Sequence, residues 1–273
     1  MLPWNCFIYE IFKLRKKMLS NIIEIIILSL VQGITEFLPI SSSAHLNIVE
    51  IIFQYKSNSL MIDVSLHLGS LLAIIFYFKK ELLNLRNNQK ILLLIIIGSI
   101  PIIITGYVLY TTKLIFLLKD NLEIIAWTTL IFGIILFFAD KCKFDKKISS
   151  NLNLKTILYI GFFQILALIP GVSRAGITIT AARIFKFNRV DAGKISFLMA
   201  IPALAGASAL SLKDTFKQDF ELNYLVLVAV TLSFIFSYFT VKFFLHYINK
   251  FSLSAFVIYR IIVALILFKI IYF

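Results

Sequence analysis

Apolar runs separated by short polar and basic breaks fill almost the whole chain. A helix needs about 20 consecutive apolar residues to cross a bilayer. Six runs approach this length and are expected to span the membrane: 61–78, 91–110, 122–139, 196–212, 222–245 and 255–273. The pattern therefore predicts an all-α polytopic membrane protein.

Two stretches inside this apolar pattern are polar and interrupt the helical periodicity. The first, at residues 32–45, reads Q-G-I-T-E-F-L-P-I-S-S-S-A-H, and the second, at 170–178, reads P-G-V-S-R-A-G-I-T. Proline removes a backbone donor and disfavours helix in the residue before it. The apolar arms beside each stretch are too short to span alone, so we expect two re-entrant hairpins, with arms at 21–37, 44–53, 157–169 and 180–187.

The two halves of the chain follow the same plan. At one constant offset, Pro39 aligns with Pro170, Ser42 with Ser173 and Ala44 with Ala175. Each half then contains one re-entrant helix hairpin plus three transmembrane helices, and an odd number of crossings inverts the second half, as in many transporters. We expect an inverted-topology repeat within one membrane domain at 21–273, with repeats at about 21–140 and 155–273 and an N-terminal extension at 1–20.

Composition agrees with a membrane protein and indicates its orientation. Hydrophobic residues make up 60% of the chain, mean hydropathy is +0.94 and net charge is +13. Lys and Arg concentrate in the loops that the topology puts on one side, so this side should be cytoplasmic: 79–90, 140–155, 186–194 and 246–250. The basic residues near the N-terminus (Lys13 to Lys17) argue against this orientation unless translation starts at Met18.

Several classes of protein do not fit the sequence. No contiguous basic face with interleaved aromatic residues occurs, so nucleic-acid binding is not expected. Cys6 and Cys142 are far apart and suggest neither a disulfide framework nor a zinc site. Residues 1–17 lack a small-residue cleavage site, so we do not expect a cleaved signal peptide.

Arg174 is the strongest candidate for binding an anion. Its guanidinium carries a planar fork of donors that matches phosphate oxygens. Gly171 and Gly176 would let the backbone approach a ligand, and the hydroxyls of Ser173 and Thr178 would add donors. The alternative is that Arg174 reaches the lipid head groups or pairs with an acid such as Asp191.

Gln32 and Glu36 lie four residues apart and share one helical face. Together they could hold a divalent cation through oxygen ligands, or Glu36 could act as a general base. The alternative is a carboxylate paired with Arg174 or a lysine only to satisfy its burial.

His45 follows the serine run closely enough for a Ser42–His45 or Glu36–His45 pair, although a lone histidine often serves as a structural donor. Ser41 is expected to contribute to substrate binding. His67 stays ambiguous between packing in its helix and facing the same cavity. A carboxylate, serines, a histidine and an arginine suit phosphoryl transfer, which depends on positioning and charge stabilisation.

At these residues the sequence resembles the undecaprenyl-diphosphate phosphatase (bacitracin-resistance) family. The shared motifs are those at 32–45 and 170–178, with D-V-S-L-H-L-G-S at 63–70 and F-x-I-Y-R at 256–260. The resemblance implies an enzyme that hydrolyses undecaprenyl diphosphate to the monophosphate, which recycles the lipid carrier for peptidoglycan synthesis and confers bacitracin resistance. It also implies a divalent cation, Mg²⁺ or Ca²⁺, and an active site on the outer side of the cytoplasmic membrane.

The resemblance assigns residues one by one. Gln32 and Glu36 match the (E/Q)xxxE motif and would hold the cation. The motif hydroxyls, imidazole and guanidinium are matched by Ser42, His45, Ser173, Arg174 and Thr178. Gln32 is the neutral option at its position. Ala175 stands where the family usually has a serine, which removes one phosphate donor.

The rival class is a transporter that flips a polyprenyl-phosphate lipid, because secondary transporters share inverted repeats and broken helices. The sequence contains no filter that would form an ion channel. Membrane lipids and the lipid substrate are the expected partners, and a homodimer is left open.

Overall fold

The computed structural model describes residues 21–53, 60–114, 121–141, 146–215 and 224–272. The regular elements of these ranges are helices. They are a first helix at Asn21–Thr35, α2 (Ser42–Phe53), α3 (Leu60–Tyr77), α4 (Lys79–Leu83), α5 (Leu85–Thr111), α7 (Leu122–Lys141), α8 (Ile148–Asn151), α9 (Leu154–Ile165), η1 (Leu166–Leu168), α10 (Arg174–Ile184), α11 (Arg189–Thr215), α12 (Tyr224–Lys250) and α13 (Ser254–Tyr272). The N-terminal extension, the start at Met18 and much of the outer loops lie outside the described residues.

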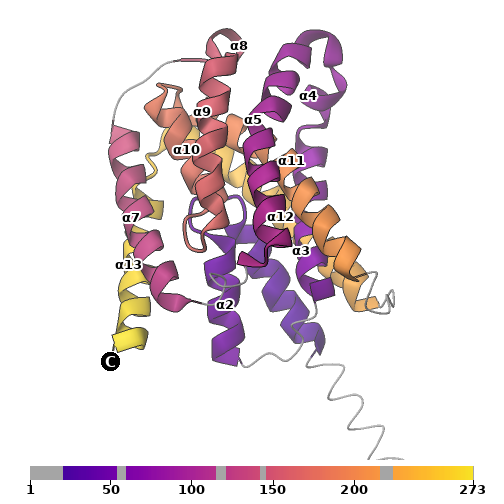
Figure 1. Cartoon of the computed structure of the whole chain (residues 1–273), viewed down its shortest axis with the longest axis vertical. Coiled ribbons are helices and arrows are strands. Elements are labelled where there is room, and N and C mark those ends of the chain that lie inside the picture. The colour runs from indigo at the N-terminus through magenta and orange to yellow at the C-terminus, as the bar shows by residue number, and fades with distance from the viewer. Residues whose placement is uncertain (1–20, 54–59, 115–120, 142–145, 216–223, 273) are drawn as a thin grey trace, which may run out of the picture.

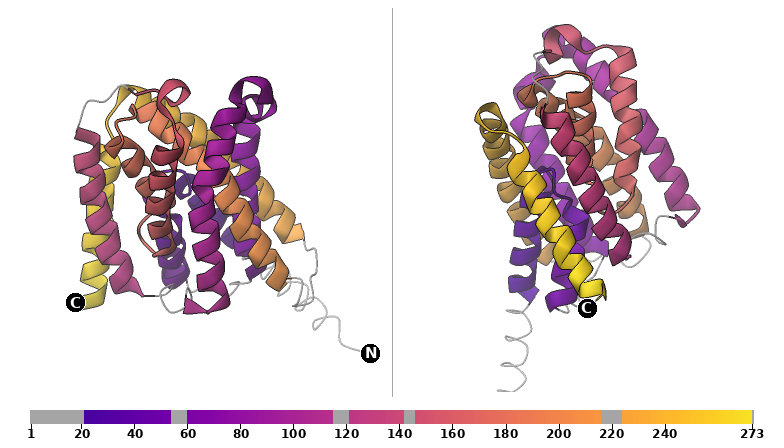
Figure 2. Two further views of the ribbon diagram at one scale, coloured as in Figure 1. Left: turned by 45° about the horizontal axis from the view of Figure 1, so that its top comes forward. Right: turned by 90° about the vertical axis from the view of Figure 1, so that its left-hand side faces the viewer.

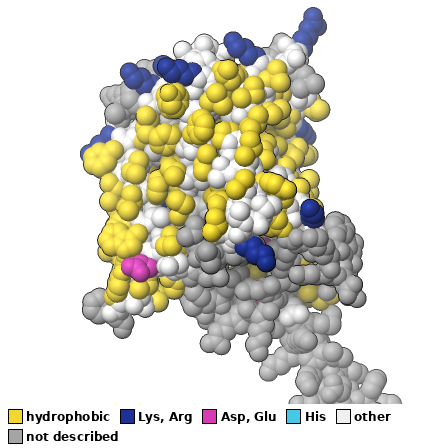
Figure 3. Space-filling model, in the orientation of Figure 1, with side chains coloured by type: hydrophobic (Ala, Val, Ile, Leu, Met, Phe, Trp, Pro, Cys, Tyr) yellow, Lys and Arg dark blue, Asp and Glu magenta, His cyan; other side chains and the backbone are white. Residues whose placement is uncertain are grey.

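The all-α polytopic membrane class is confirmed. Five helices are long and apolar enough to cross a membrane: α5, α7, α11, α12 and α13. The sixth expected span is helix α3, whose described part, Met61–Tyr77, belongs to the shorter apolar helices. Figure 3 shows a face covered mainly by hydrophobic side chains, with Lys and Arg gathered toward the end that carries α4 and α8.

The two polar stretches form turns between antiparallel helices (Figures 1 and 2). The first helix and α2 extend from the end of the molecule where the C-terminus lies, and their turn sits in the middle. Helices α9 and α10 extend from the other end, beside α8, and their turn also reaches the middle. Two chain segments that are far apart in sequence therefore bring their polar residues to one level.

The long helices pack closely through small residues, as membrane helices commonly do. Helices α3 and α12 are joined by the hydroxyls of Ser70, Ser233 and Ser237, with Ser237 Oγ 2.9 Å from Ser70 Oγ. At Gly69 a Cβ would lie only 2.4 Å from the carbonyl oxygen of Val230. The two helices are therefore packed too closely to admit a larger side chain at this position.

Both helices that follow the turns begin earlier than the sequence predicts, at Ser42 and Arg174. The reason is the residue before each helix: Ser41 has φ 75° and Ser173 has φ 71°, a left-handed conformation that is uncommon without glycine. The side chain of Ser173 also accepts a hydrogen bond from Gly176 N and caps α10. Ser41 and Ser173 thus share a left-handed conformation directly before a helix.

A buried ionic cluster holds the helix ends together beside α8. The carboxylate of Asp140, at the end of α7, accepts from Arg189 Nε at 2.7 Å and from Leu253 N at 2.9 Å, and lies 3.4 Å from Arg183 Nε. Asp140 and Arg183 are both almost fully buried. One carboxylate thus connects α7, α10, α11 and the turn before α13.

We expect Asp140→Asn to lower the free energy of unfolding by about 3–5 kcal/mol, because Arg183 would stay buried without its counter-charge. Thermal unfolding of the purified protein in detergent measures the change. Glu123→Gln is the matched control, because Glu123 is exposed and its carboxylate accepts from the neutral hydroxyl of Tyr272. Equal melting temperatures for the two variants would contradict this assignment.

Candidate active site

The two turns meet in the middle of the molecule and are held by one arginine. Arg260 of α13 is 1% exposed. Its guanidinium donates to the carbonyl oxygen of Pro39 in the first turn at 3.2 Å and to those of Gly171 and Val172 in the second at 3.0 and 3.1 Å. It also donates to the carbonyls of Thr128 and Thr129 on α7. All these acceptors are neutral, so Arg260 fixes both turns and leaves a positive charge beside them.

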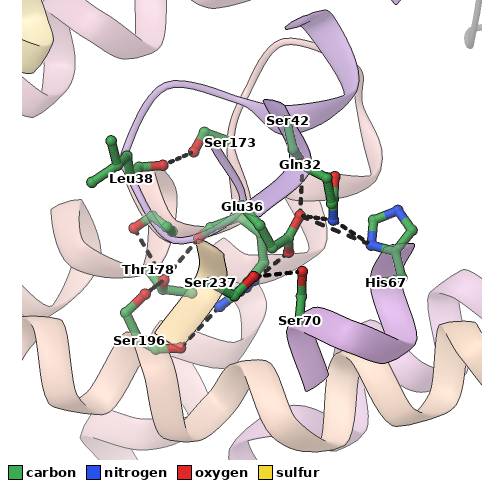
Figure 4. A network of polar contacts seen from close by, with 12 residues as sticks. Gln32, Glu36, Leu38, Ser42, His67, Ser70, Ser173, Thr178, Ser196 and Ser237 are labelled. Atoms are coloured by element: carbon green, nitrogen blue, oxygen red, sulfur yellow. Dashed lines mark hydrogen bonds and ion pairs between the residues drawn. The ribbon is translucent and has the colours of Figure 1, made fainter. Parts of the chain in front are cut away.

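Glu36 lies at the centre of the polar contacts between the turns (Figure 4). Its Oε1 atom accepts from Arg174 Nη2 at 2.9 Å, and its Oε2 atom accepts from Ser42 Oγ at 2.6 Å and from Gln32 Nε2 at 3.2 Å. Glu36 is 7% exposed, and a buried carboxylate needs such donors. The structure therefore pairs Arg174 with Glu36, while Asp191 accepts from Ile148 N and Asn188.

His67, which the sequence left ambiguous, belongs to this cluster. Its Nδ1 atom lies 3.0 Å from Gln32 Nε2 and 3.9 Å from Glu36 Oε2. Because the amide nitrogen of Gln32 only donates, this contact makes Nδ1 of His67 an acceptor. Figure 4 shows Gln32, Glu36, Ser42 and His67 pointing toward one another.

His45 pairs with neither of the partners proposed from the sequence. Its Nδ1 atom lies 2.6 Å from the carbonyl oxygen of Ser41, and its Nε2 atom lies 2.7 Å from Tyr259 Oη on α13. The Ser42 hydroxyl donates to Glu36 instead. The reason is geometric: α2 begins at Ser42, so the His45 ring turns back onto the residue before the helix.

The hydroxyls expected to bind substrate are engaged by the protein. Thr178 Oγ1 lies 2.7 Å from both Arg174 O and Ser196 Oγ, and Ser173 Oγ lies 3.5 Å from Leu38 O. Arg174 Nη1 donates to the carbonyl of Ser196 at 3.2 Å. These contacts hold the Arg174 side chain toward Glu36 and fasten the second turn to α11.

The remaining predicted binding positions, Ser41, Gly171 and Gly176, make contacts within the protein. Ser41 Oγ contacts Ser43 Oγ at 3.3 Å. Gly171 has φ 87°, and a Cβ there would lie 2.2 Å from Thr128 Oγ1, so glycine lets the turn pack against α7. A Cβ on Gly176 would lie 3.2 Å from that of Ser173. In this structure the glycines allow close contact between segments of the chain itself.

Oxygen atoms of Gln32 and Glu36 are the candidate cation ligands. The Oε1 atom of Gln32 is buried and accepts no hydrogen bond from the described residues. Among the described residues no group of three or more His, Cys, Asp and Glu could hold a metal ion. One carboxylate and one free amide oxygen fit Mg²⁺, which commonly takes few protein ligands and is completed by water and substrate phosphate.

Sequence reasoning did not assign a role to Tyr259 or Arg260. Both stand in the F-x-I-Y-R motif near the start of the last span, where an arginine among apolar residues is itself an indication of function. Their partners could not be read from the motif, because they lie in α2, in the two turns and in α7.

These features define the class of the protein. The protein is a helical polytopic membrane protein with a buried carboxylate–guanidinium pair, bordered by hydroxyls and histidines, where two helix turns meet. Such a site suits an anionic substrate such as a phosphate ester.

The chain belongs to the family described as bacitracin resistance protein BacA, whose model matches residues 25–266. An undecaprenyl-diphosphatase of Pelagibacter ubique (strain HTCC1062) is 79% identical over 255 residues, which cover 93% of this chain and 100% of that protein. The undecaprenyl-diphosphatase of Elusimicrobium minutum (strain Pei191) is 39% identical over 261 residues, covering 90% of this chain and 96% of its own. That of Alteromonas mediterranea is 36% identical over 268 residues, covering 90% and 97%.

We expect Gly171→Ala to disrupt the second turn. A residue with a Cβ would add strain of about 1–3 kcal/mol at this φ and would collide with Thr128 and Ile125. Melting temperature and phosphate release should both fall. Gly106→Ala on α5 is the control, since a Cβ there meets only Leu168 at 3.7 Å. Comparable stability of the two variants would contradict the packing role.

Proposed function

We propose that this protein hydrolyses undecaprenyl diphosphate to undecaprenyl phosphate and inorganic phosphate. The name of the 79% identical relative and the family match support this activity. Hydrolysis would recycle the lipid carrier for peptidoglycan synthesis and confer resistance to bacitracin. The single structural observation that carries the proposal is the contact of Glu36 with both Ser42 and Arg174 where the turns meet.

Positive potential at this point would bind the diphosphate. Arg174 supplies a guanidinium whose other N–H groups can turn to phosphate oxygens. Helices α2 and α10 both begin at the turns, and the N-terminus of a helix carries a partial positive charge and free backbone donors. Arg260, whose guanidinium donates to backbone carbonyls, adds a full charge close by.

Ser42 and Glu36 would perform the substitution at phosphorus. The Ser42 hydroxyl already directs its proton to Glu36 Oε2 at 2.6 Å, so Glu36 is placed to accept that proton. The oxygen that attacks the terminal phosphorus comes from Ser42 or from a water that Ser42 holds. As the new P–O bond forms, the bond to the bridging oxygen breaks, and undecaprenyl phosphate leaves with that oxygen. Attack by water gives inorganic phosphate directly; attack by Ser42 gives a phosphoserine, whose phosphoryl group a water then takes to release inorganic phosphate and restore the hydroxyl.

A divalent cation, Mg²⁺ or Ca²⁺, is part of the proposal. Glu36 and the free Oε1 atom of Gln32 would hold it. When bound, such an ion neutralises charge on the phosphate oxygens. His67 would stay outside the ligand set and orient Gln32 by accepting from its amide nitrogen.

We further propose that the two halves form the inverted-topology repeat expected from the sequence. The two helix pairs enter from opposite ends (Figures 1 and 2), and both turns carry a serine with positive φ, Ser41 and Ser173. Counting back equally from the two serines reaches Gln32 and Gln164, both fully buried amides. The offset that aligns Ser41 with Ser173 would therefore also align the helices that precede the two turns.

The orientation follows from charge. The end with α4 and α8 carries the exposed basic residues, so we place it in the cytoplasm. The first helix and α2 then open to the outer side of the bacterial cytoplasmic membrane, where the substrate would enter. A homodimer stays a prediction from the sequence.

The alternative of a lipid flippase is less favoured. It is based on the fold-level likeness to transporters, whereas the similar proteins are named as diphosphatases.

We expect Arg174→Lys to reduce phosphate release about 100- to 1,000-fold, because lysine keeps the charge but loses the planar fork. The assay uses purified protein and a long-chain prenyl diphosphate, with and without EDTA. Arg86→Lys, at an exposed position on α5, is the control and should retain wild-type turnover. Release near the wild-type rate in Arg174→Lys would remove Arg174 from the mechanism, and no release from folded wild-type protein would refute the activity.

We expect Gln32→Glu to bind Mg²⁺ more tightly, because a second carboxylate raises the negative charge of the ligand set. Half-maximal activation should need roughly tenfold less Mg²⁺, equivalent to about 1.4 kcal/mol. Mg²⁺ should also raise the melting temperature of this variant more than that of the wild type. Unchanged titration midpoints in both measurements would place the cation elsewhere.

A further inference from the structure

The hydrogen bonds of His45 define which ring nitrogen carries its proton. Nδ1 lies 2.6 Å from the carbonyl oxygen of Ser41, and a carbonyl can only accept, so Nδ1 must donate. In the neutral ring Nε2 is then an acceptor, and the hydroxyl 2.7 Å away on Tyr259 must donate to it.

We propose that Tyr259 is a positioning residue that holds the Nε2 atom, and with it the orientation, of the His45 ring. This inference rests on the proposed function and takes His45, the imidazole of the 32–45 motif, as a group that relays protons at the site. With Nδ1 committed to Ser41, Nε2 is the basic atom of the ring. A hydroxyl is suited to hold that atom, because it can donate to the neutral ring and accept from the protonated one.

Contacts of neighbouring residues hold Tyr259 beside His45. Tyr259 neighbours Arg260, which anchors α13 to both turns through backbone carbonyls. Packing of α2 against α7 and α13 also includes Ala44, next to His45, with Leu267. The rings of His45 and Tyr259 are stacked, with their centroids 5.5 Å apart and their planes 10° from parallel. The tyrosine is therefore held in register with the histidine by contacts on both sides.

Partial exposure suits a residue at the edge of the site. Tyr259 is 40% exposed, whereas Arg260 beside it is 1% exposed. The phenol is therefore accessible from outside the protein, while its neighbour is enclosed by it.

Tyr259→Phe tests the proposal by removing only the hydroxyl. We expect kcat to fall about 10- to 100-fold, the size of effect known for groups that orient a ligating histidine, with little change in KM or melting temperature. The matched control is Tyr272→Phe on the same helix, whose hydroxyl contacts Glu123 far from the turns and which should retain wild-type kcat. A fall in melting temperature that accounts for the lost activity, or an unchanged kcat, would overturn the positioning role.

A second measurement does not depend on activity. The chain has only 3 histidines, so ¹⁵N-histidine labelling gives few signals to assign by substitution. We expect His45 to be protonated at Nδ1 in both proteins, because the Ser41 carbonyl remains its acceptor, and the Nε2 signal to shift in Tyr259→Phe, where its hydrogen bond is lost. An unchanged Nε2 signal would overturn the inference. If the wild type released no phosphate but the Nε2 signal shifted, the proposed function would fail while the Tyr259–His45 contact would stand.

Discussion

A carboxylate buried among apolar helices must be matched by a positive charge and by hydrogen-bond donors, and this constraint organises the centre of the molecule. Glu36 belongs to the first turn and Arg174 to the second, and their contact at 2.9 Å links the two halves. The same carboxylate receives the hydroxyl of Ser42. The requirement to satisfy one buried charge thus assembles a guanidinium, a hydroxyl and a carboxylate at one place.

Arg260 meets a similar requirement for the backbone carbonyl groups of the turns. Turns that interrupt helices leave carbonyl groups without partners, and such groups are costly away from water. One guanidinium satisfies carbonyls of both turns and of α7, which no smaller donor could reach together. Because none of these acceptors carries a charge, the arginine also contributes positive potential where two helix N-termini already favour an anion. Arg260 thus both satisfies the carbonyls of the turns and adds positive charge beside them.

The basic end of the molecule has a different role. There Asp140 is surrounded by Arg183, Arg189 and the Leu253 amide, and the cluster joins helix ends without bordering the turns. Arginine therefore appears in two settings, paired with a carboxylate at a helix end and paired with carbonyls or Glu36 at the turns. In the second setting the hydroxyl of Ser42 donates to Glu36 and the His67 ring lies 3.9 Å from it, which separates the candidate site from the structural cluster.

The sequence by itself determined the membrane class, the two broken stretches and the kinds of side chain that could do chemistry, because hydropathy and helix interruption depend on neighbouring residues. It did not decide the partners. Arg174 could have paired with Asp191, and His45 with Ser42, until positive φ at Ser41 and Ser173 fixed where the helices begin. The contacts of Arg260 and Tyr259 with α2, α7 and both turns were decided only by tertiary structure, because they join segments whose approach no local pattern encodes.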